Sequence, residues 1–213
     1  MKIFVLHYSK LVDRKKHILE QFNKQGIIDY EFIEKYDKNE ISEDDSNLFD
    51  TYYSKPHMSL YLKHTYVYNI IAEHYEHALI LEDDVILCDN FVENLNNYMS
   101  ELPEDFDMLF IGDGCNLHIE KDKLIPNKNI YEKCLHPTSW GGLGATRCTD
   151  SYIISKKCSK KLCEYINSLE SKINLHIDWW LNVASRDNNL KVYWAEPTIV
   201  TQGSQNGLFQ RCL

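Results

Sequence analysis

Apolar runs and amphipathic stretches alternate along the first forty residues. The run KIFVLH at residues 2–7 predicts a β-strand, and apolar positions at roughly helical spacing predict a helix from Leu11 to Lys24 that stops at Gly26. A second short strand, YEFIEKY at residues 30–36, follows directly. Strand, helix and strand in this order indicate a βαβ unit, which is typical of the opening of an α/β fold.

The next segments lead to an unusual acidic run. Residues 37–56 are rich in Asp, Asn, Ser and Glu, and they suit a surface excursion or a short helix. Helical spacing returns in residues 57–78, with Ser59 as the expected N-cap. This helix runs into ALILEDDVIL at residues 78–87, where three consecutive carboxylates interrupt what we interpret as one buried strand.

The second half of the chain continues the alternation of helices and strands. The predicted elements are a helix at 90–100, a strand at 106–112, a polar loop at 113–137, a strand at 151–155, a helix at 156–169, a helix at 176–185 and a strand at 191–197. No repeat, low-complexity tract or interdomain linker stands out. We therefore expect residues 1–213 to form a single α/β domain, either alone or within a longer chain.

Composition and charge exclude several classes of protein. The chain has 213 residues, of which 44% are hydrophobic, and this is enough to bury a substantial core. A net charge of −9 argues against nucleic-acid partners, because binding to a phosphate backbone needs a basic surface. Seven cysteines without C-x-x-C pairing indicate neither a zinc ribbon nor a disulfide scaffold. No apolar run suits a transmembrane segment or a signal peptide, so we expect a cytoplasmic location.

The acidic run Glu82, Asp83 and Asp84 carries the most specific chemical signal. Adjacent anions repel, and burying one costs several kcal/mol unless a proton, a cation or hydrogen-bond donors meet it. Strand alternation would send Glu82 and Asp84 to one side and Asp83 to the other. Oxygen ligands at a strand end are what hard divalent cations prefer, often with phosphate as a further ligand. A solvated strand end or a helix N-cap cluster is the alternative.

Several stretches carry a family pattern in the same order along nearly the whole chain. They are FVLHYSKLVDRKKHILEQF (4–22), SLYLKHTYVYN (59–69), ALILEDDVIL (78–87), DSYIISKKCSKKL (150–162), IDWWL (177–181) and VYWAEPTIVTQ (192–202). In these stretches the chain resembles glycosyltransferase family 25, the lipooligosaccharide and procollagen galactosyltransferase group. The resemblance implies a GT-A (Rossmann-like) fold for nucleotide-diphospho-sugar transfer, with a mixed, mostly parallel sheet flanked by helices. The N-terminal half would bind nucleotide-sugar and metal, and the C-terminal half the acceptor.

The same resemblance implies roles for the acidic run, which is a DXD-like motif. Asp84 would bind Mn²⁺ or Mg²⁺, and Glu82 would lie beside it, facing the ribose or a metal-bound water. Asp83 would accept a hydrogen bond from a donor-sugar hydroxyl. The metal would stabilise the departing diphosphate as a Lewis acid. Gln202 and Ser204 are the remaining polar candidates for a phosphate or metal contact.

Other residues are candidates for contacts with the nucleotide-sugar: His7, Tyr8, Ser9, Arg14, Tyr36, Lys63 and Trp140. The first three follow the first strand, and ligands bind at the carboxyl ends of strands in open α/β sheets. Arg14 would pair with phosphate, or form a surface ion pair with Asp13 or another neighbour. Tyr36 would stack on the base or simply pack half-buried. Lys63 would reach uracil or phosphate, or lie on a solvated helix face.

Two stretches depart from the family pattern near the expected nucleotide. The first strand ends in His7, Tyr8 and Ser9, where the family usually has Asn-Leu-x-Arg. EKYDKNE at residues 34–40 stands where an Asp-Gly turn is more usual. Because both loops should lie near the nucleotide, these departures bear on which donor is bound.

An inverting transfer needs a general base that takes the proton of the acceptor hydroxyl. Asp178 is the first candidate, because it lies at a predicted helix start beside Trp179 and Trp180, whose faces suit a sugar ring. The alternative is an N-cap aspartate with two core tryptophans. Asp150 is the reserve candidate, at the end of the glycine-rich stretch TSWGGLGATRCTD, in which Trp140 is a candidate sugar platform.

The sequence therefore predicts a metal-dependent inverting glycosyltransferase that moves a hexose from a UDP-sugar to a hydroxyl of a glycan or glycoprotein acceptor. Two other classes stay open. One is a module of the same fold that binds a sugar nucleotide or glycan without turnover. The other is a metal-dependent phosphohydrolase, for which we would expect a second acidic cluster at another strand end, where FIGDG (110–114) offers only Asp113.

Overall fold

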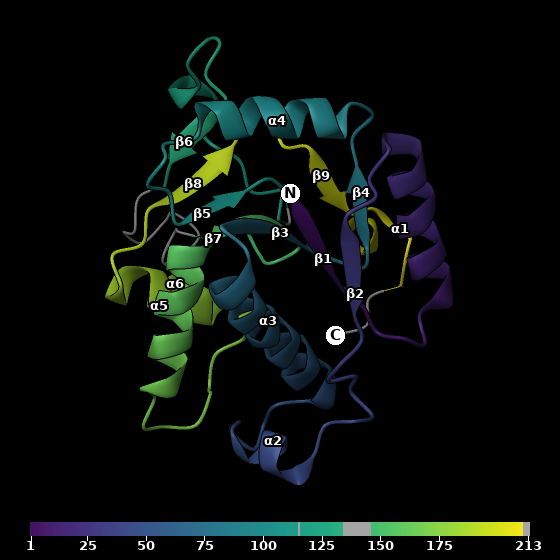
Figure 1. Ribbon diagram of the computed structural model, residues 1–213, viewed down its shortest axis with the longest axis vertical. Coiled ribbons are helices and arrows are strands. Elements are labelled where there is room, and N and C mark those ends of the chain that lie inside the picture. Colours follow the sequence, from purple (N-terminus) through teal and green to yellow (C-terminus); the bar gives the residue numbers. More distant parts are fainter. Residues whose placement is uncertain (115, 134–145, 211–213) are drawn as a thin grey trace.

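A seven-stranded sheet is the centre of the computed structural model, which describes residues 1–114, 116–133 and 146–210 (Figure 1). Its order is β2-β1-β3-β7-β5-β8-β6. The strands are β1 (Lys2–Leu6), β2 (Tyr30–Ile33), β3 (His77–Glu82), β5 (Met108–Phe110), β6 (Ile130–Glu132), β7 (Ser151–Ser155) and β8 (Val192–Ala195). Strands β2, β1, β3, β5 and β8 run in one direction, and β7 and β6 oppose them. The predicted α/β fold with a mixed, mostly parallel sheet flanked by helices is confirmed.

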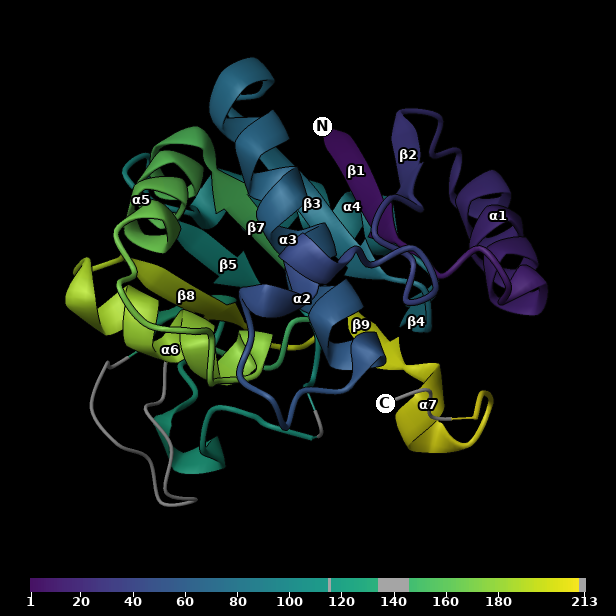
Figure 2. The ribbon, with the colours of Figure 1, turned by 90° about the horizontal axis from the view of Figure 1, so that it is seen from below.

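Helices cover both faces of this sheet. They are α1 (Val12–Gln25), α2 (Glu43–Asn47), α3 (Lys55–His74), α4 (Phe91–Glu101), α5 (Lys156–Asn167), α6 (Ile177–Asp187) and α7 (Gly203–Asn206), with a 3-10 turn η1 at Lys121–Lys123. Helices α1 and α4 lie on one face, and α3, α5 and α6 on the other (Figures 1 and 2). The parallel pairing of β1 with β2 around α1 confirms the predicted βαβ unit.

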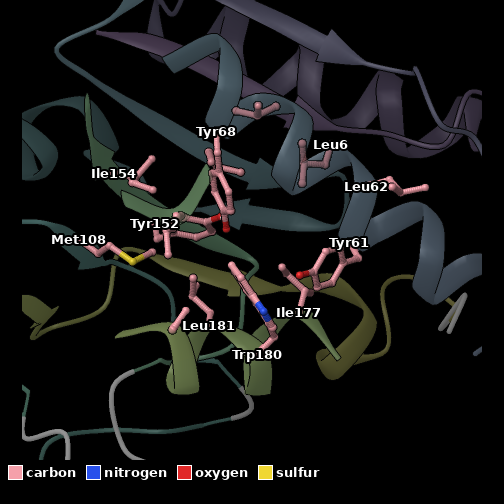
Figure 3. Close-up of a cluster of buried hydrophobic side chains, with 14 of the residues drawn as sticks. Leu6, Tyr61, Leu62, Tyr68, Met108, Tyr152, Ile154, Ile177, Trp180 and Leu181 are labelled. Atoms are coloured by element: carbon pink, nitrogen blue, oxygen red, sulfur yellow. The ribbon is translucent and has the colours of Figure 1, made fainter. Parts of the chain in front are cut away.

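The alternation of side chains along each strand divides the core into two parts. In β1, Ile3 and Val5 pack with the α1 and α4 side, whereas Phe4 and Leu6 pack with the α3, α5 and α6 side. Figure 3 shows part of the second cluster, in which Tyr61 of α3 lies near Trp180 of α6. Burial of both faces explains why the strands read as continuous apolar runs in the sequence.

The acidic run lies in a turn between two sheets. Strand β3 ends at Glu82, and β4 (Val85–Leu87) pairs with β9 (Val200–Gln202) in a separate two-stranded sheet. The prediction of one continuous strand was therefore wrong, and strand alternation does not govern Asp83 and Asp84. The physical reason is that consecutive carboxylates in a buried ladder would place one of them in the apolar core.

Three other segments differ from the sequence prediction. Helix α3 begins at Lys55, with Ser54 as its N-cap and Pro56 in its first turn, so Ser59 lies inside the helix. The predicted polar loop at 113–137 contains η1 and β6. The C-terminal tail contributes β9 and α7, which we did not predict. Among the helices described here, none has the length and apolar character needed to cross a membrane.

Candidate active site

The site begins where the carboxyl ends of β1 and β3 lie side by side. Leu6 and Glu82 are register partners, so the residues that follow them, His7 and Asp83, meet just beyond the ends of the two strands. A cavity of about 330 Å³ opens there, which we call the first cavity. It is lined by Leu6, His7, Tyr8, Leu11, Arg14, Lys38, Pro56, Ser59, Leu60, Lys63, Glu82, Asp83, Asp84, Gln202, Ser204 and Gln205. Most of the predicted site residues are thus brought together at one sheet edge.

Asp83 accepts hydrogen bonds from three neighbours. His7 Nδ1 lies 2.8 Å from Oδ2, the backbone N–H of Tyr8 donates to the same oxygen (3.2 Å), and Arg14 Nη1 donates to Oδ1 (2.7 Å). Burial acts to raise the pKa of Asp83, but the bonds from His7 and Arg14 hold the pKa below its usual range. Arg14 therefore pairs with Asp83 rather than with Asp13. The predicted contact of Asp83 with a sugar hydroxyl stays a prediction.

Asp84 has the opposite environment. Its side chain is buried, Oδ1 has no hydrogen-bond partner, and Arg14 Nη1 is 3.9 Å from Oδ2. Burial, and then repulsion from Glu82, raise the pKa of Asp84 to about 6, against a hydrogen bond from Ser204. The backbone N–H of Gly203 donates to the Asp84 carbonyl (2.7 Å), which holds α7 against the acidic turn. A buried carboxylate oxygen without a partner favours the approach of a cation.

Glu82 is supported by a buried chain of polar groups that sequence reasoning missed. Thr149 Oγ1 donates to Glu82 Oε1 (2.8 Å), and His64 Nε2 lies 3.7 Å from the same oxygen. Behind them, His64 Nδ1 is 2.8 Å from the Tyr152 hydroxyl, which is 2.7 Å from the Tyr68 hydroxyl. His64, Tyr152 and Tyr68 are fully buried. The one signal in the sequence is that these three polar side chains stand within an otherwise apolar helix and strand.

The residues at the acidic turn fit a divalent cation that is shared with a substrate. Over the described residues, no group of three or more His, Cys, Asp or Glu side chains is arranged to hold a metal ion. Glu82 and Asp84 nevertheless both line the first cavity, and Asp84 has an oxygen without a partner. Mg²⁺ is usually bound by one or two carboxylates together with substrate phosphates, and this pair of carboxylates suits that mode.

Lys63 is buried rather than solvated. Its ammonium donates to the carbonyls of Ile33 (3.0 Å) and Lys35 (2.9 Å) and to Asp37 Oδ1 (2.8 Å), so all three N–H groups are engaged. Burial lowers the pKa of Lys63, although Asp37 favours the charged form. The alternative of a solvated face was therefore wrong. Contact of Lys63 with uracil or phosphate stays a prediction.

Asp37, which sequence reasoning missed, anchors the loop after β2. It accepts from the backbone N–H and the hydroxyl of Ser9 at 3.1 and 2.5 Å, besides Lys63. Burial opposes the charge of Asp37, but bonds from Lys63 and Ser9 lower its pKa. Tyr36 has φ +66°, its carbonyl accepts from Ser59 Oγ (2.6 Å), and its ring lies against Tyr66. Neither Ser9 nor Tyr36 is among the residues lining the first cavity.

A second cavity of about 270 Å³ adjoins the first. It is lined by His57, Leu60, Glu82, Cys148, Thr149, His176, Ile177, Asp178, Trp179, Gln202 and Gln205, four of which also line the first cavity. Asp178 lies in the first turn of α6, and burial raises its pKa. Trp179 is 44% exposed and Trp180 only 4%, so the alternative of two core tryptophans was wrong for Trp179.

Asp150 lies deeper than its role as a reserve base requires. It is fully buried, Ser151 Oγ donates to Oδ2 (2.8 Å), and Oδ1 has no partner. Burial raises the pKa of Asp150 well above its usual range, which favours the neutral acid. Asp150 lines neither cavity, and its catalytic role stays a prediction. Trp140 and the glycines beside it lie outside the described residues.

Known proteins that are similar to this chain include glycosyltransferases. The profile of glycosyltransferase family 25 (LPS biosynthesis protein) matches residues 1–180. A candidate glycosyltransferase of Acanthamoeba polyphaga mimivirus is 27% identical over 140 residues, which are 62% of this chain and 42% of that protein. The chain thus spans less than half the length of this relative. The crystal structure of a glycosyltransferase involved in glycosylation of the major capsid of PBCV-1 aligns with a TM-score of 0.43 and 10% identity, over 98% of this chain and 100% of that chain.

Proposed function

The chain belongs to glycosyltransferase family 25, and from this premise we propose that it transfers a hexose from a UDP-sugar to a hydroxyl of a glycan or glycoprotein acceptor. The reaction inverts the configuration at the anomeric carbon and uses Mn²⁺ or Mg²⁺. The donor binds in the first cavity and the acceptor in the second. Because direct transfer requires two substrates at once, adjoining cavities support this assignment over a simple hydrolase.

The proposal is carried by the buried oxygen of Asp84 that lacks a partner in the first cavity. The cavity lies at the carboxyl ends of β1 and β3, where open α/β sheets bind ligands. Asp84 and Glu82 would hold the metal ion, which as a Lewis acid stabilises negative charge on a leaving diphosphate. Arg14 orients the acidic turn through Asp83 and adds positive charge beside Asp84.

Asp178 is the proposed general base. It lines the second cavity, and burial raises its pKa toward the range in which a base works efficiently near neutral pH. The exposed ring of Trp179, next to it in the same cavity, offers an apolar face for a sugar. Together they define where an acceptor hydroxyl would be activated.

Calorimetric titration of UDP with and without Mn²⁺ tests the donor assignment. The wild type is compared with Asp84→Asn, and Asp89→Asn is the matched control because its exposed carboxylate follows the next strand and pairs with Lys24. We expect binding that depends on Mn²⁺, is lost in Asp84→Asn and is kept in Asp89→Asn. Equal binding with and without Mn²⁺, or by Asp84→Asn, would contradict the metal role; no binding by the wild type would contradict the UDP assignment.

A further inference from the structure

The loop after β2 contributes Lys38 to the wall of the first cavity, and the proposed function assigns no role to this side chain. Three lysine and arginine side chains line this cavity in the described part of the chain, namely Arg14, Lys38 and Lys63. Lys38 lies in the turn that Asp37 anchors, next to Tyr8 in the cavity wall. A diphosphate brings at least two negative charges, so the basic groups that remain available decide how the cavity meets it.

Two of the three cations are already committed to protein partners. Arg14 donates to Asp83 Oδ1 and, through Nη2, to the backbone carbonyl of Gln210 (2.7 Å). Lys63 gives all three of its N–H groups to two carbonyls and Asp37. The pairs Arg14–Asp83 and Lys63–Asp37 are each balanced in charge, and moving either cation onto a ligand would leave a buried carboxylate without its partner.

Lys38 is different. Within the part of the chain that the structure describes, its ammonium forms no hydrogen bond or ion pair, and its one contact is with the Tyr8 ring, 4.7 Å from the ring centroid. All three of its N–H donors therefore remain available to a ligand. The Tyr8 hydroxyl accepts from Asn39 Nδ2 (3.0 Å), so the ring that Lys38 rests on is itself held in place.

The backbone that presents Lys38 is fixed before any ligand arrives. Asp37 on its N-terminal side is bonded to Ser9 and Lys63, and the Asp37 carbonyl accepts from the backbone N–H of Glu40 (2.7 Å). The Tyr36 carbonyl is held by Ser59. A side chain on such a preorganised turn binds with a smaller loss of conformational entropy than one on a loose loop.

We propose that Lys38 binds the diphosphate of the donor, and that Lys63 positions the loop from which Lys38 reaches it. This inference rests on the proposed function, because it takes the donor to be a nucleoside diphosphate sugar. It assigns phosphate binding to Lys38, which was not among the candidates from the sequence. It assigns a structural role to Lys63, which was. The positive charge of Lys38 also complements the negative charges that Glu82 and Asp84 contribute to the same cavity.

The test compares three variants in the presence of Mn²⁺. Lys38→Gln removes the charge, and Lys38→Arg keeps it. Lys35→Gln is the control, because Lys35 lies in the same turn but points to the Tyr36 and Tyr66 rings, outside the cavity. Affinities for UDP and inorganic pyrophosphate are measured by calorimetry, and uridine binding by ligand-observed NMR. We expect Lys38→Gln to weaken UDP and pyrophosphate about tenfold or more, and uridine not at all. Lys38→Arg and Lys35→Gln should both stay near wild type.

Each outcome decides the matter. Unchanged affinity of Lys38→Gln for both UDP and pyrophosphate would overturn the role of Lys38 and leave the proposed function standing. An equal loss for uridine would overturn it too, because the residue would then act on the nucleoside or on folding, which a matching thermal melt distinguishes. If the wild type bound pyrophosphate through Lys38 but not UDP, the UDP assignment would fail and this inference would stand. Binding of neither ligand would sink both.

Discussion

Asp84 is held in surroundings that oppose its own charge. Its pKa is raised to about 6, first by burial and then by Glu82, whereas the usual value is 3.8. A carboxyl with a raised pKa in the folded state stabilises folding while it is protonated, and this contribution disappears as the pH rises from about 4 through 6. A pKa shift of about two units corresponds to about 3 kcal/mol, so the ionised side chain of Asp84 lowers the free energy of unfolding by an amount of that order at neutral pH.

Asp84→Asn should therefore stabilise the protein when no divalent cation is present. We expect the free energy of unfolding at pH 8 to rise by about 1–3 kcal/mol, because the amide removes the buried charge, and to change little at pH 4, where Asp84 is already protonated in the fold. Urea denaturation with a chelator at both pH values measures this. Asp89→Asn, at an exposed position, should show no such gain. A less stable Asp84→Asn at pH 8 would contradict the prediction.

Asp178→Asn separates the base from the donor site. We expect UDP affinity with Mn²⁺ to stay within about twofold, since Asp178 lines the second cavity but not the first, and kcat to fall by about 10²–10⁴, the usual contribution of a general base. The wild-type rate should rise with pH through a pKa above the ordinary aspartate value, because burial raises the pKa of Asp178. A transfer rate that the variant retains would rule out this residue as the base.

The chemistry of single residues was partly predictable. Three adjacent acids in an apolar context indicate a site by themselves, and the structure places them at a cavity. Their partners were not predictable, because Arg14 is 69 residues from Asp83 in the sequence and yet pairs with it rather than with the adjacent Asp13. Lys63 was expected to meet solvent or ligand, and only the fold shows that Asp37 and two carbonyls surround it.

Among the secondary-structure elements, α3 and β7 are joined by a buried hydrogen-bond chain of His64, Tyr152 and Tyr68, and His64 Nε2 lies 3.7 Å from Glu82 Oε1. Figure 3 shows Tyr68 of α3 and Tyr152 of β7 facing each other inside the core. Tyr152 is the central member, because its hydroxyl lies within hydrogen-bond distance of both His64 and Tyr68. The chain thus holds α3 against β7 behind Glu82.

Removing the central hydroxyl should cost more than removing the terminal one. We expect Tyr152→Phe to lower the free energy of unfolding by about 2–3 kcal/mol, since it leaves two buried polar groups without a partner, and Tyr68→Phe by about 1 kcal/mol. Chemical denaturation of the two variants checks this, and each serves as the size-matched control for the other. Equal losses would show that the chain is not a connected network.

Elements with their own periodicity were predicted, and those that depend on a distant partner were not. Helix α1 and strand β7 were found within a residue or two, because each carries enough apolar positions to define its period. Strands β4 and β9 have three residues each and pair across more than a hundred residues of sequence. A segment that short has no measurable period, so the turn at the acids could not be seen in the sequence.

Over the whole molecule, the C-terminal tail packs against the first helix at Arg14. The Gln210 carbonyl accepts from Arg14 Nη2, and the Phe209 ring lies 5.3 Å from the guanidinium and beside His17. Residues before and after this contact line the first cavity, namely Leu6, His7 and Tyr8 from the start of the chain and Gln202, Ser204 and Gln205 from the tail. The family resemblance assigned nucleotide-sugar and metal to the N-terminal half and the acceptor to the C-terminal half, but it did not predict that the tail returns to the first helix.

Phe209→Ala should loosen this closure. We expect a loss of about 1 kcal/mol in the free energy of unfolding, from the lost cation–π contact and packing, together with weaker binding of UDP because Arg14 no longer holds Asp83 as firmly. Leu208→Ala is the control, since Leu208 is 53% exposed and precedes the contact. Thermal melting and calorimetry measure both effects, and a Phe209→Ala protein that matches Leu208→Ala in both would show that the tail contact is incidental.

The acidic turn also connects the two sheets of the molecule. The chain is paired in the large sheet as far as Glu82 and in the small sheet from Val85 to Leu87. The small sheet is tied in turn to the chain that continues β5, because Val200 bridges Gly112 and its carbonyl accepts from the backbone N–H of Asp113 (3.2 Å), so the position of Asp84 depends on both sheets. Residues 196–199 lead into β9 and line neither cavity, so a change there would reach the acids only through the backbone that joins the two sheets.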